Sequence, residues 1–104
     1  MTELHEGARV DQVREALKLV IDPELGQNVV DLGLIYDVAV IDDCIVSIAM
    51  TTTTRGCPAT GYLRQGVEEA AKNVEGIAFA QVKLTYDPPW SPALIAPEIA
   101  HLLG

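Results

Sequence analysis

The sequence predicts a small α+β domain, a two-layer α/β sandwich with elements in the order α-β-β-α-β-α and a small mixed sheet. Three observations support this fold class. Two long segments repeat apolar residues at helical spacing, three segments alternate apolar and polar residues as strands do, and a helical segment separates the last two strands. A strand, a crossover helix and a further strand favour parallel pairing, whereas a short turn favours an antiparallel hairpin. We therefore expect a mixed sheet with its helices largely on one face.

The first helix is predicted over Arg9–Ile21. Asp22-Pro23 ends it, because the residue before a proline is pushed out of the helical region. Its apolar residues recur at a spacing that builds one buried stripe along the helix. These residues are Val10, Val13, Leu17, Val20 and Ile21.

Two strands are predicted next, at about Leu32–Ile41 and Cys44–Thr51, where the sequence alternates and is rich in β-branched residues. Only Asp42-Asp43 lies between them, which predicts a tight hairpin turn.

The second helix is predicted from about Pro58 to Asn73, since proline suits a first helical turn and the apolar spacing is helical. Ile77–Tyr86 follows as a third strand. Asp87-Pro88-Pro89-Trp90 then requires an extended segment, because neither proline can donate to a strand ladder. A short last helix is predicted from Pro97 to Leu103.

The 104 residues are enough for one domain with a single core, and a hydrophobic content of 49% is too high for a disordered tail. We expect a flexible N-terminal segment over residues 1–8 and one domain over residues 9–104. A formal net charge of −8 argues against nucleic acid as a partner, because phosphate binding needs clustered Lys and Arg.

No apolar run approaches the ~18 residues of a membrane-spanning helix, so no membrane association is expected. The acidic first residues also lack the basic and apolar regions of a secretory signal. The expected location is therefore cytoplasmic, where the two cysteines are free thiols rather than a disulfide.

The most informative candidate site is the loop that joins the second strand to the second helix. Cys57 lies at or just before the start of this helix, where free backbone N–H groups stabilise a thiolate. A nearby arginine adds a cation, the threonine hydroxyls can hydrogen-bond an anion or water, and a glycine permits close backbone approach or positive φ. Such a thiolate is a good nucleophile and a good soft-metal ligand, with an inert buried cysteine as the alternative. The supporting residues are Thr51, Thr53, Arg55, Gly56 and Pro58.

Cys44 is predicted to be a packing residue. Strand alternation places it on the same face as Val46, Ile48 and Met50, which suggests a small core side chain.

A second polar cluster follows the first helix. Asp22, Glu24, Asn28 and Asp31 have side chains that commonly hold turns, which is the simpler interpretation. The functional interpretation has Glu24 and Asp31 beside the cysteine, as oxygen ligands or proton acceptors. The sequence alone does not bring these loops together.

Trp90 is the only tryptophan of the chain. Its Pro-Pro-Trp context suits either packing over a core edge or a rigid anchor for a partner protein.

Four motifs in fixed order resemble one known family. They are Asp22-Pro23-Glu24, residues 28–36 (NVVDLGLIY), Thr51-x-Thr53-x-x-Gly56-Cys57-Pro58 and Asp87-Pro88-Pro89-Trp90. With this order and spacing, the chain resembles the iron–sulfur cluster assembly family of the MIP-type, SufT-like and PaaD-like proteins. The resemblance covers roughly residues 10–104.

This resemblance implies the fold of NifU C-terminal domains and a non-enzymatic accessory factor that assembles iron–sulfur clusters or delivers them to client apoproteins. The implied partners are the assembly machinery and its clients. The reactive cysteine of the family corresponds to Cys57, the implied metal ligand, and its acidic loop to Glu24 and Asp31. Its Pro-Pro-Trp loop, which lies near that cysteine, corresponds to Pro88, Pro89 and Trp90, a possible partner contact.

Two departures from the family pattern bear on the subtype. Ala96 stands where a serine often caps the last helix, and the cysteine-rich C-terminal extension of PaaD-like proteins is missing from this sequence. A PaaD-like role in maturing a multicomponent oxygenase is therefore less favoured than a SufT-like role.

An iron–sulfur cluster takes about four thiolate ligands, whereas this chain offers one good candidate, Cys57. A cluster would be transient and would bridge two subunits of a homodimer, or would use small thiols or a partner's ligands. A docking adaptor without a cluster is the alternative. Two other classes remain: a thiol-dependent enzyme with Cys57 as nucleophile and Asp31 or Glu24 handling protons, and an acidic interaction module for basic surfaces.

Overall fold

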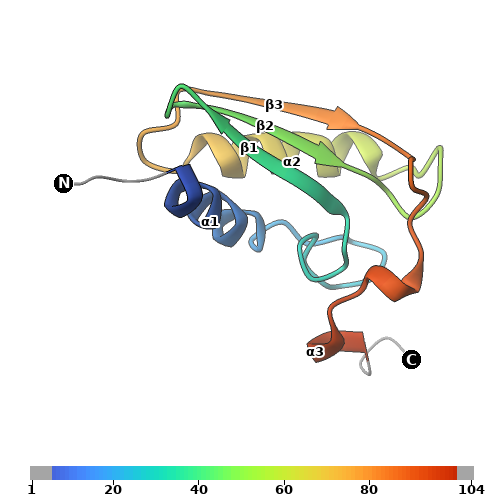
Figure 1. Ribbon diagram of the computed structural model, residues 1–104. Helices are drawn as coiled ribbons and strands as arrows, with labels where there is room; N and C mark the ends of the chain where they lie inside the picture. Colours follow the sequence, from blue (N-terminus) through green and yellow to red (C-terminus); the bar gives the residue numbers. More distant parts are fainter. Residues whose placement is uncertain (1–5, 101–104) are drawn as a thin grey trace.

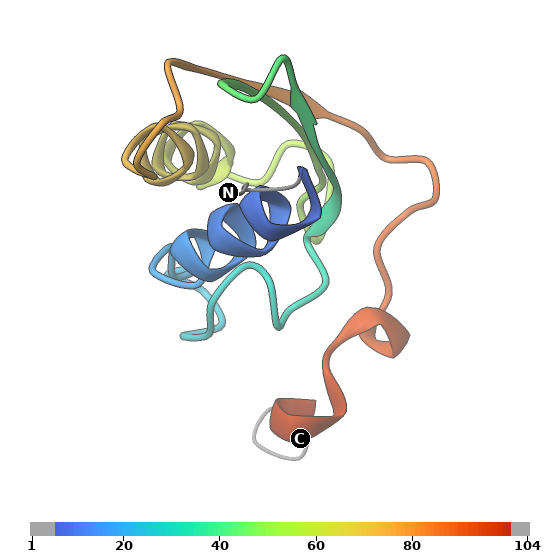
Figure 2. The ribbon, with the colours of Figure 1, turned by 60° about the vertical axis from the view of Figure 1, so that its left-hand side comes forward.

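The computed structural model describes residues 6–100. One layer is a three-stranded sheet, and the other consists of two helices, α1 and α2, that lie side by side against the same face of the sheet (Figures 1 and 2). The predicted two-layer sandwich and the order α-β-β-α-β-α are confirmed, with a short 3₁₀ helix added before the last helix. The elements are α1 (Glu6–Leu17), β1 (Ile35–Ile41), β2 (Ile45–Met50), α2 (Thr60–Lys72), β3 (Phe79–Leu84), η1 (Pro92–Leu94) and α3 (Pro97–Ala100).

The sheet has the strand order β1-β2-β3 and is mixed, as predicted. Strands β1 and β2 pair antiparallel, whereas β2 and β3 pair parallel across the α2 crossover. The hairpin turn has positive φ at both central residues, 53° at Asp42 and 67° at Asp43. This geometry matches the right-handed twist of the flanking strands, and aspartate tolerates it better than most residues.

The core lies between the sheet and the two helices. Alternate residues of β2 point into it, and Val46, Ile48 and Met50 have no exposed surface. From α2, Leu63 and Val67 are equally buried. Burying one such aliphatic side chain contributes about 1.5–3 kcal/mol relative to leaving it exposed.

Helix α1 differs from its prediction at both ends. It begins at Glu6, so residues 6–8 of the predicted flexible segment are helical, while residues 1–5 lie outside the described part. It ends at Leu17, and the chain continues in tighter turns through Val20, whose N–H donates to the Leu17 carbonyl at 3.0 Å. The predicted placement of Ile21 in the buried stripe is wrong: it forms a β-bridge with Asn28 and is 43% exposed.

The strands β1 and β3 and the helix α2 are shorter than predicted. Residues 31–33 form a turn before β1, which begins only at Ile35, and β3 begins at Phe79 and ends at Leu84. Helix α2 begins at Thr60 rather than Pro58. Helix α3 begins at Pro97 as predicted, and the part predicted beyond Ala100 lies outside the described residues.

Arg9 ties α1 to the end of the sheet where the hairpin turns. Its Nη1 donates to the Glu75 carbonyl at 2.7 Å, and its Nε lies 3.4 Å from the Asp43 carboxylate. Only 9% of Arg9 is exposed, so these two contacts, rather than water, stabilise its guanidinium charge. Across residues 6–100, the helices are all too short or too polar to cross a membrane.

Candidate functional site

Cys57 lies in the loop between β2 and α2, three residues before the first residue of the helix. Its carbonyl accepts hydrogen bonds from the backbone N–H of Thr60 at 3.0 Å and from the Thr60 hydroxyl at 2.7 Å. Its Sγ donates to the Glu24 Oε1 at 3.8 Å, a long hydrogen bond. Only 7% of Cys57 is exposed, so the residue is buried although the residues on either side of it are exposed.

Glu24 reaches the thiol because Asp22 folds the preceding loop. The Asp22 carboxylate accepts the backbone N–H groups of Glu24 at 2.7 Å and of Leu25 at 3.2 Å, and Asp22 is 1% exposed. Asp22 is therefore a turn-forming residue, as its simpler interpretation held. Glu24 is the acidic residue that the fold brings beside Cys57.

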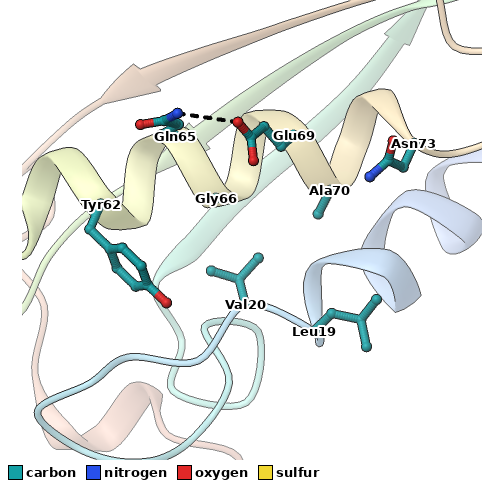
Figure 3. A pocket seen from close by; sticks show the side chains of 8 residues that line it. All are labelled: Leu19, Val20, Tyr62, Gln65, Gly66, Glu69, Ala70 and Asn73. Atoms are coloured by element: carbon teal, nitrogen blue, oxygen red, sulfur yellow. Dashed lines mark hydrogen bonds between the residues drawn. The ribbon is translucent and has the colours of Figure 1, made fainter.

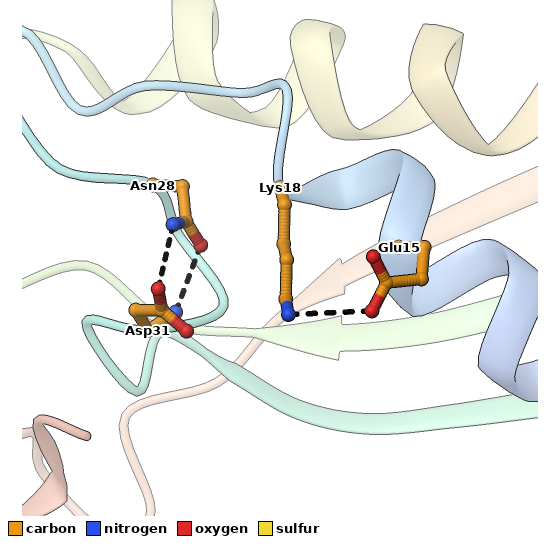
Figure 4. A network of polar contacts seen from close by, with 4 residues as sticks. All are labelled: Glu15, Lys18, Asn28 and Asp31. Atoms are coloured by element: carbon orange, nitrogen blue, oxygen red, sulfur yellow. Dashed lines mark hydrogen bonds and ion pairs between the residues drawn. The ribbon is translucent and has the colours of Figure 1, made fainter. Parts of the chain in front are cut away.

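Asn28 and Asp31 hold the next turn together (Figure 4). The Asn28 side chain accepts the backbone N–H of Asp31 at 2.9 Å and donates to the Asp31 carboxylate at 2.9 Å. The Asp31 carbonyl also accepts the N–H of Ala96 at 2.7 Å, which attaches the C-terminal segment to this turn. These hydrogen bonds of Asp31 are structural, and among the described residues no hydrogen bond joins it to Cys57.

Buried threonine side chains stabilise the loop between β2 and α2. Thr51 and Thr52 are 0% and 1% exposed, and their hydroxyl groups donate to backbone carbonyls. The Thr52 Oγ1 lies 2.8 Å from the Tyr86 hydroxyl, and the Arg55 guanidinium lies over the Tyr86 ring, 4.7 Å from its centroid. The hydroxyl groups of Thr51 and Thr52 therefore stabilise the loop. Thr53 is half-buried, and Arg55, Gly56 and Pro58 are exposed around the cysteine.

The Pro-Pro-Trp segment is anchored next to β1. The Trp90 Nε1 donates to the Leu32 carbonyl at 2.7 Å, and the half-buried ring packs against the core. Of the two interpretations of Trp90, packing over a core edge is therefore the one that the structure shows. The Pro88 carbonyl accepts the Tyr36 hydroxyl at 2.8 Å. Pro88 and Pro89 remain exposed.

The alternation predicted that Cys44 lies on the apolar face of β2, and this prediction is wrong. Cys44 occupies the hairpin turn one residue before the strand begins and is half-buried. Its carbonyl accepts the N–H of Ala78 at 2.7 Å, so its backbone, rather than its side chain, joins the hairpin to β3. Cys44 is more exposed than Cys57, the reverse of the expected order.

A groove of about 470 Å³ separates the end of α1 from α2 (Figure 3). Leu19 and Tyr62 form its walls and are 82% and 63% exposed, and the small residues Gly66 and Ala70 lie between them. Its lining does not include Cys57.

The described residues contain no group of three or more His, Cys, Asp or Glu side chains arranged to hold a metal ion. Cys57 and Glu24 provide two donors, which is fewer than the about four ligands of an iron–sulfur cluster.

Comparison with known proteins gives one consistent result. Residues 10–84 match the family model described as iron–sulfur cluster assembly protein. The chain is 35% identical to an Fe-S protein maturation auxiliary factor of Porphyromonas gingivalis, over 90% of each chain. It is 35% identical to the Fe-S protein maturation auxiliary factor SufT of Staphylococcus aureus, over 83% of this chain and 98% of that one.

A solved structure of a domain of unknown function from Bacillus anthracis superposes with a TM-score of 0.86 at 34% identity, covering 93% of this chain and 92% of the other. The resemblance deduced from the four motifs is therefore confirmed for both sequence and fold. The chain belongs to the iron–sulfur cluster assembly protein family.

Proposed function

We propose that this protein is an accessory factor that assembles iron–sulfur clusters or delivers them to client apoproteins, with Cys57 as the thiol that binds the cargo. The observation that carries the proposal is the buried Cys57 thiol beside the Glu24 carboxylate, within the region that matches the family model. The two relatives named as maturation auxiliary factors support the same role.

The Cys57–Glu24 contact suits the binding of iron. Thiolate, rather than thiol, is the metal ligand, so the S–H bond must break when the S–Fe bond forms. The Glu24 Oε1, 3.8 Å from Sγ, is the nearby acceptor for that proton. Transfer to a client reverses the step: the S–Fe bond breaks, and the proton returns to sulfur.

The cluster is held transiently, because one chain supplies too few ligands. We propose that the remaining ligands come from a second copy of the chain, from small thiols, or from a partner of the assembly machinery. Exposed Pro88 and Pro89, beside the anchored Trp90, are the proposed contact for such partners. The net charge of −8 favours protein partners with basic surfaces over nucleic acid, and the proposed setting is the cytoplasm.

The same thiol–carboxylate contact also suits a thiol-dependent enzyme, in which Cys57 attacks a substrate and Glu24 accepts its proton. We favour the accessory role because the named relatives are described as maturation auxiliary factors. A PaaD-like role in oxygenase maturation would use the same thiol on a narrower set of clients.

An anaerobic transfer assay tests the proposal. The full chain is reconstituted with iron and sulfide, and the maturation of a cluster-free client enzyme is followed by its visible absorbance and its activity. Cys57→Ser is expected to reduce transfer by more than the roughly 10- to 100-fold loss typical of supporting residues near a metal, since a hydroxyl is a poor soft-metal ligand. The matched control is Cys44→Ser, which is expected to retain transfer because Cys44 lies beyond the opposite end of β2.

Circular dichroism checks that both variants fold. Iron and sulfide analysis, combined with the mass in solution, should give at most one cluster per two subunits. Undiminished transfer by folded Cys57→Ser would disprove the proposed role of the thiol. One full cluster per monomer, stable without added thiol, would show that the chain has ligands beyond Cys57 and Glu24.

A further inference from the structure

Tyr86, which follows β3 by two residues, makes two contacts with the loop that carries Cys57. Its hydroxyl lies 2.8 Å from the Thr52 Oγ1, and that oxygen donates its own hydrogen to the Thr54 carbonyl at 2.7 Å. Tyr86 is therefore the donor to Thr52. Its ring lies beneath the Arg55 guanidinium at 4.7 Å, within the range of a cation–π interaction. One aromatic side chain thus holds the loop at residues 52 and 55.

The loop is also held on the other side of Cys57. The backbone N–H and the hydroxyl of Thr60 both donate to the Cys57 carbonyl. Between these attachments lies Gly56, with φ at 74° and open space where a Cβ would be. A residue with a side chain would adopt this φ at a cost, so glycine allows the chain to turn immediately before Cys57.

The Cys57 thiol must become accessible before it can bind cargo from another molecule. Cys57 is a buried residue, 7% exposed, in this conformation of the loop, and the contacts of Tyr86 oppose any displacement of residues 52–55. We infer that Tyr86 is a positioning residue that holds the Cys57 loop closed, and that its contacts with Thr52 and Arg55 set how often the thiol is accessible. The importance of this closure for cluster transfer rests on the proposed function of Cys57, whereas the closure itself does not.

The closure is tested by the rate at which iodoacetamide alkylates each cysteine in the native full chain, measured by peptide mass spectrometry. When opening is rapid and limited, the alkylation rate follows the fraction of open molecules. Tyr86→Phe removes the hydroxyl contact and keeps the ring, and should raise the Cys57 rate about fivefold, the equivalent of one hydrogen bond. Tyr86→Ala removes both contacts and should raise it by about tenfold or more. The Cys44 rate should not change.

The matched control is Tyr36→Phe, which removes a hydroxyl hydrogen bond of the same length, to the Pro88 carbonyl, outside the Cys57 loop. It should leave the Cys57 rate unchanged. An unchanged Cys57 rate in Tyr86→Phe would overturn the inference. Equal acceleration of Cys44 and Cys57 would also overturn it, because Tyr86 would then support the whole fold rather than the loop.

Tyr86→Phe decides the question if Tyr86→Ala does not fold. Because alkylation requires no iron or sulfide, its outcome is independent of the transfer assay. Failure of the wild-type chain to transfer a cluster would refute the proposed function and leave the closure standing. A Cys57 alkylation rate that is slow in the wild-type chain and raised by Tyr86→Phe would support the closure whatever the outcome of the transfer assay.

Discussion

Gly33 is a test of how the C-terminal segment is attached to the fold. Its φ is 77°, and a Cβ built on it would collide with the Leu94 carbonyl and Cβ. Left-handed φ costs a residue with a side chain about 1–2 kcal/mol. Overpacking against backbone costs about 1–3 kcal/mol more. Gly33→Ala should therefore lower the free energy of unfolding by about 2–5 kcal/mol, a large share of the roughly 5–15 kcal/mol of a typical domain.

Gly26→Ala is the matched control. Gly26 has a φ of 72°, nearly that of Gly33, but nothing lies within 4 Å of its built Cβ. Gly26→Ala should therefore lower the free energy of unfolding only by the cost of the left-handed φ, about 1–2 kcal/mol. The difference between the two variants isolates the contact between Gly33 and the C-terminal segment.

Urea unfolding followed by circular dichroism and by the fluorescence of Trp90, the only tryptophan, measures both variants. Coincident transitions by the two probes establish that a single free energy applies. Equal losses for Gly33→Ala and Gly26→Ala, within about 0.5 kcal/mol, would refute the reasoning, because such a difference is the usual error of additivity.

Two further changes in stability follow from the packing. Trp90→Phe should cost about 1 kcal/mol, since it removes the 2.7 Å hydrogen bond to the Leu32 carbonyl and keeps an aromatic ring, and urea unfolding followed by circular dichroism should show it. A loss near zero would mean that water replaces the indole donor. Leu63→Ala should cost about 2–5 kcal/mol because Leu63 is fully buried, whereas Leu19→Ala, at a position 82% exposed, should change stability by less than about 0.5 kcal/mol. Similar losses at both leucines would contradict the assigned core.

The fold was predictable where a local pattern coincides with burial. Alternation in the hairpin follows the inward face of β2, and Asp42 and Asp43 form the predicted tight turn. Ile21 was misplaced because its helical spacing continues beyond the point where the chain leaves the helix. Its bridge to Asn28, seven residues away, is a tertiary contact that periodicity does not encode.

The site was predictable only in part. The cysteine motif identified the loop, but the partner of the thiol depends on how Asp22 folds the segment before Glu24. Tyr86 was missed because it ends a predicted strand, where an aromatic residue is ordinary. The residues around Tyr86 gave no signal of its contact with Thr52, because Thr52 lies 34 residues earlier in the chain.

The parallel pairing of β2 with β3 has a consequence for how the chain reaches its native state. Every registered pair, from Ile45 with Phe79 to Met50 with Leu84, joins residues 34 positions apart. The hairpin forms from neighbours, whereas this pairing must first close a long loop through α2. Until β3 docks, β2 is an edge strand with Val46, Ile48 and Met50 on one face, which is a template for pairing with other chains. Docking of α2 and β3 is thus the step that both completes the sheet and protects the newly made chain from aggregation.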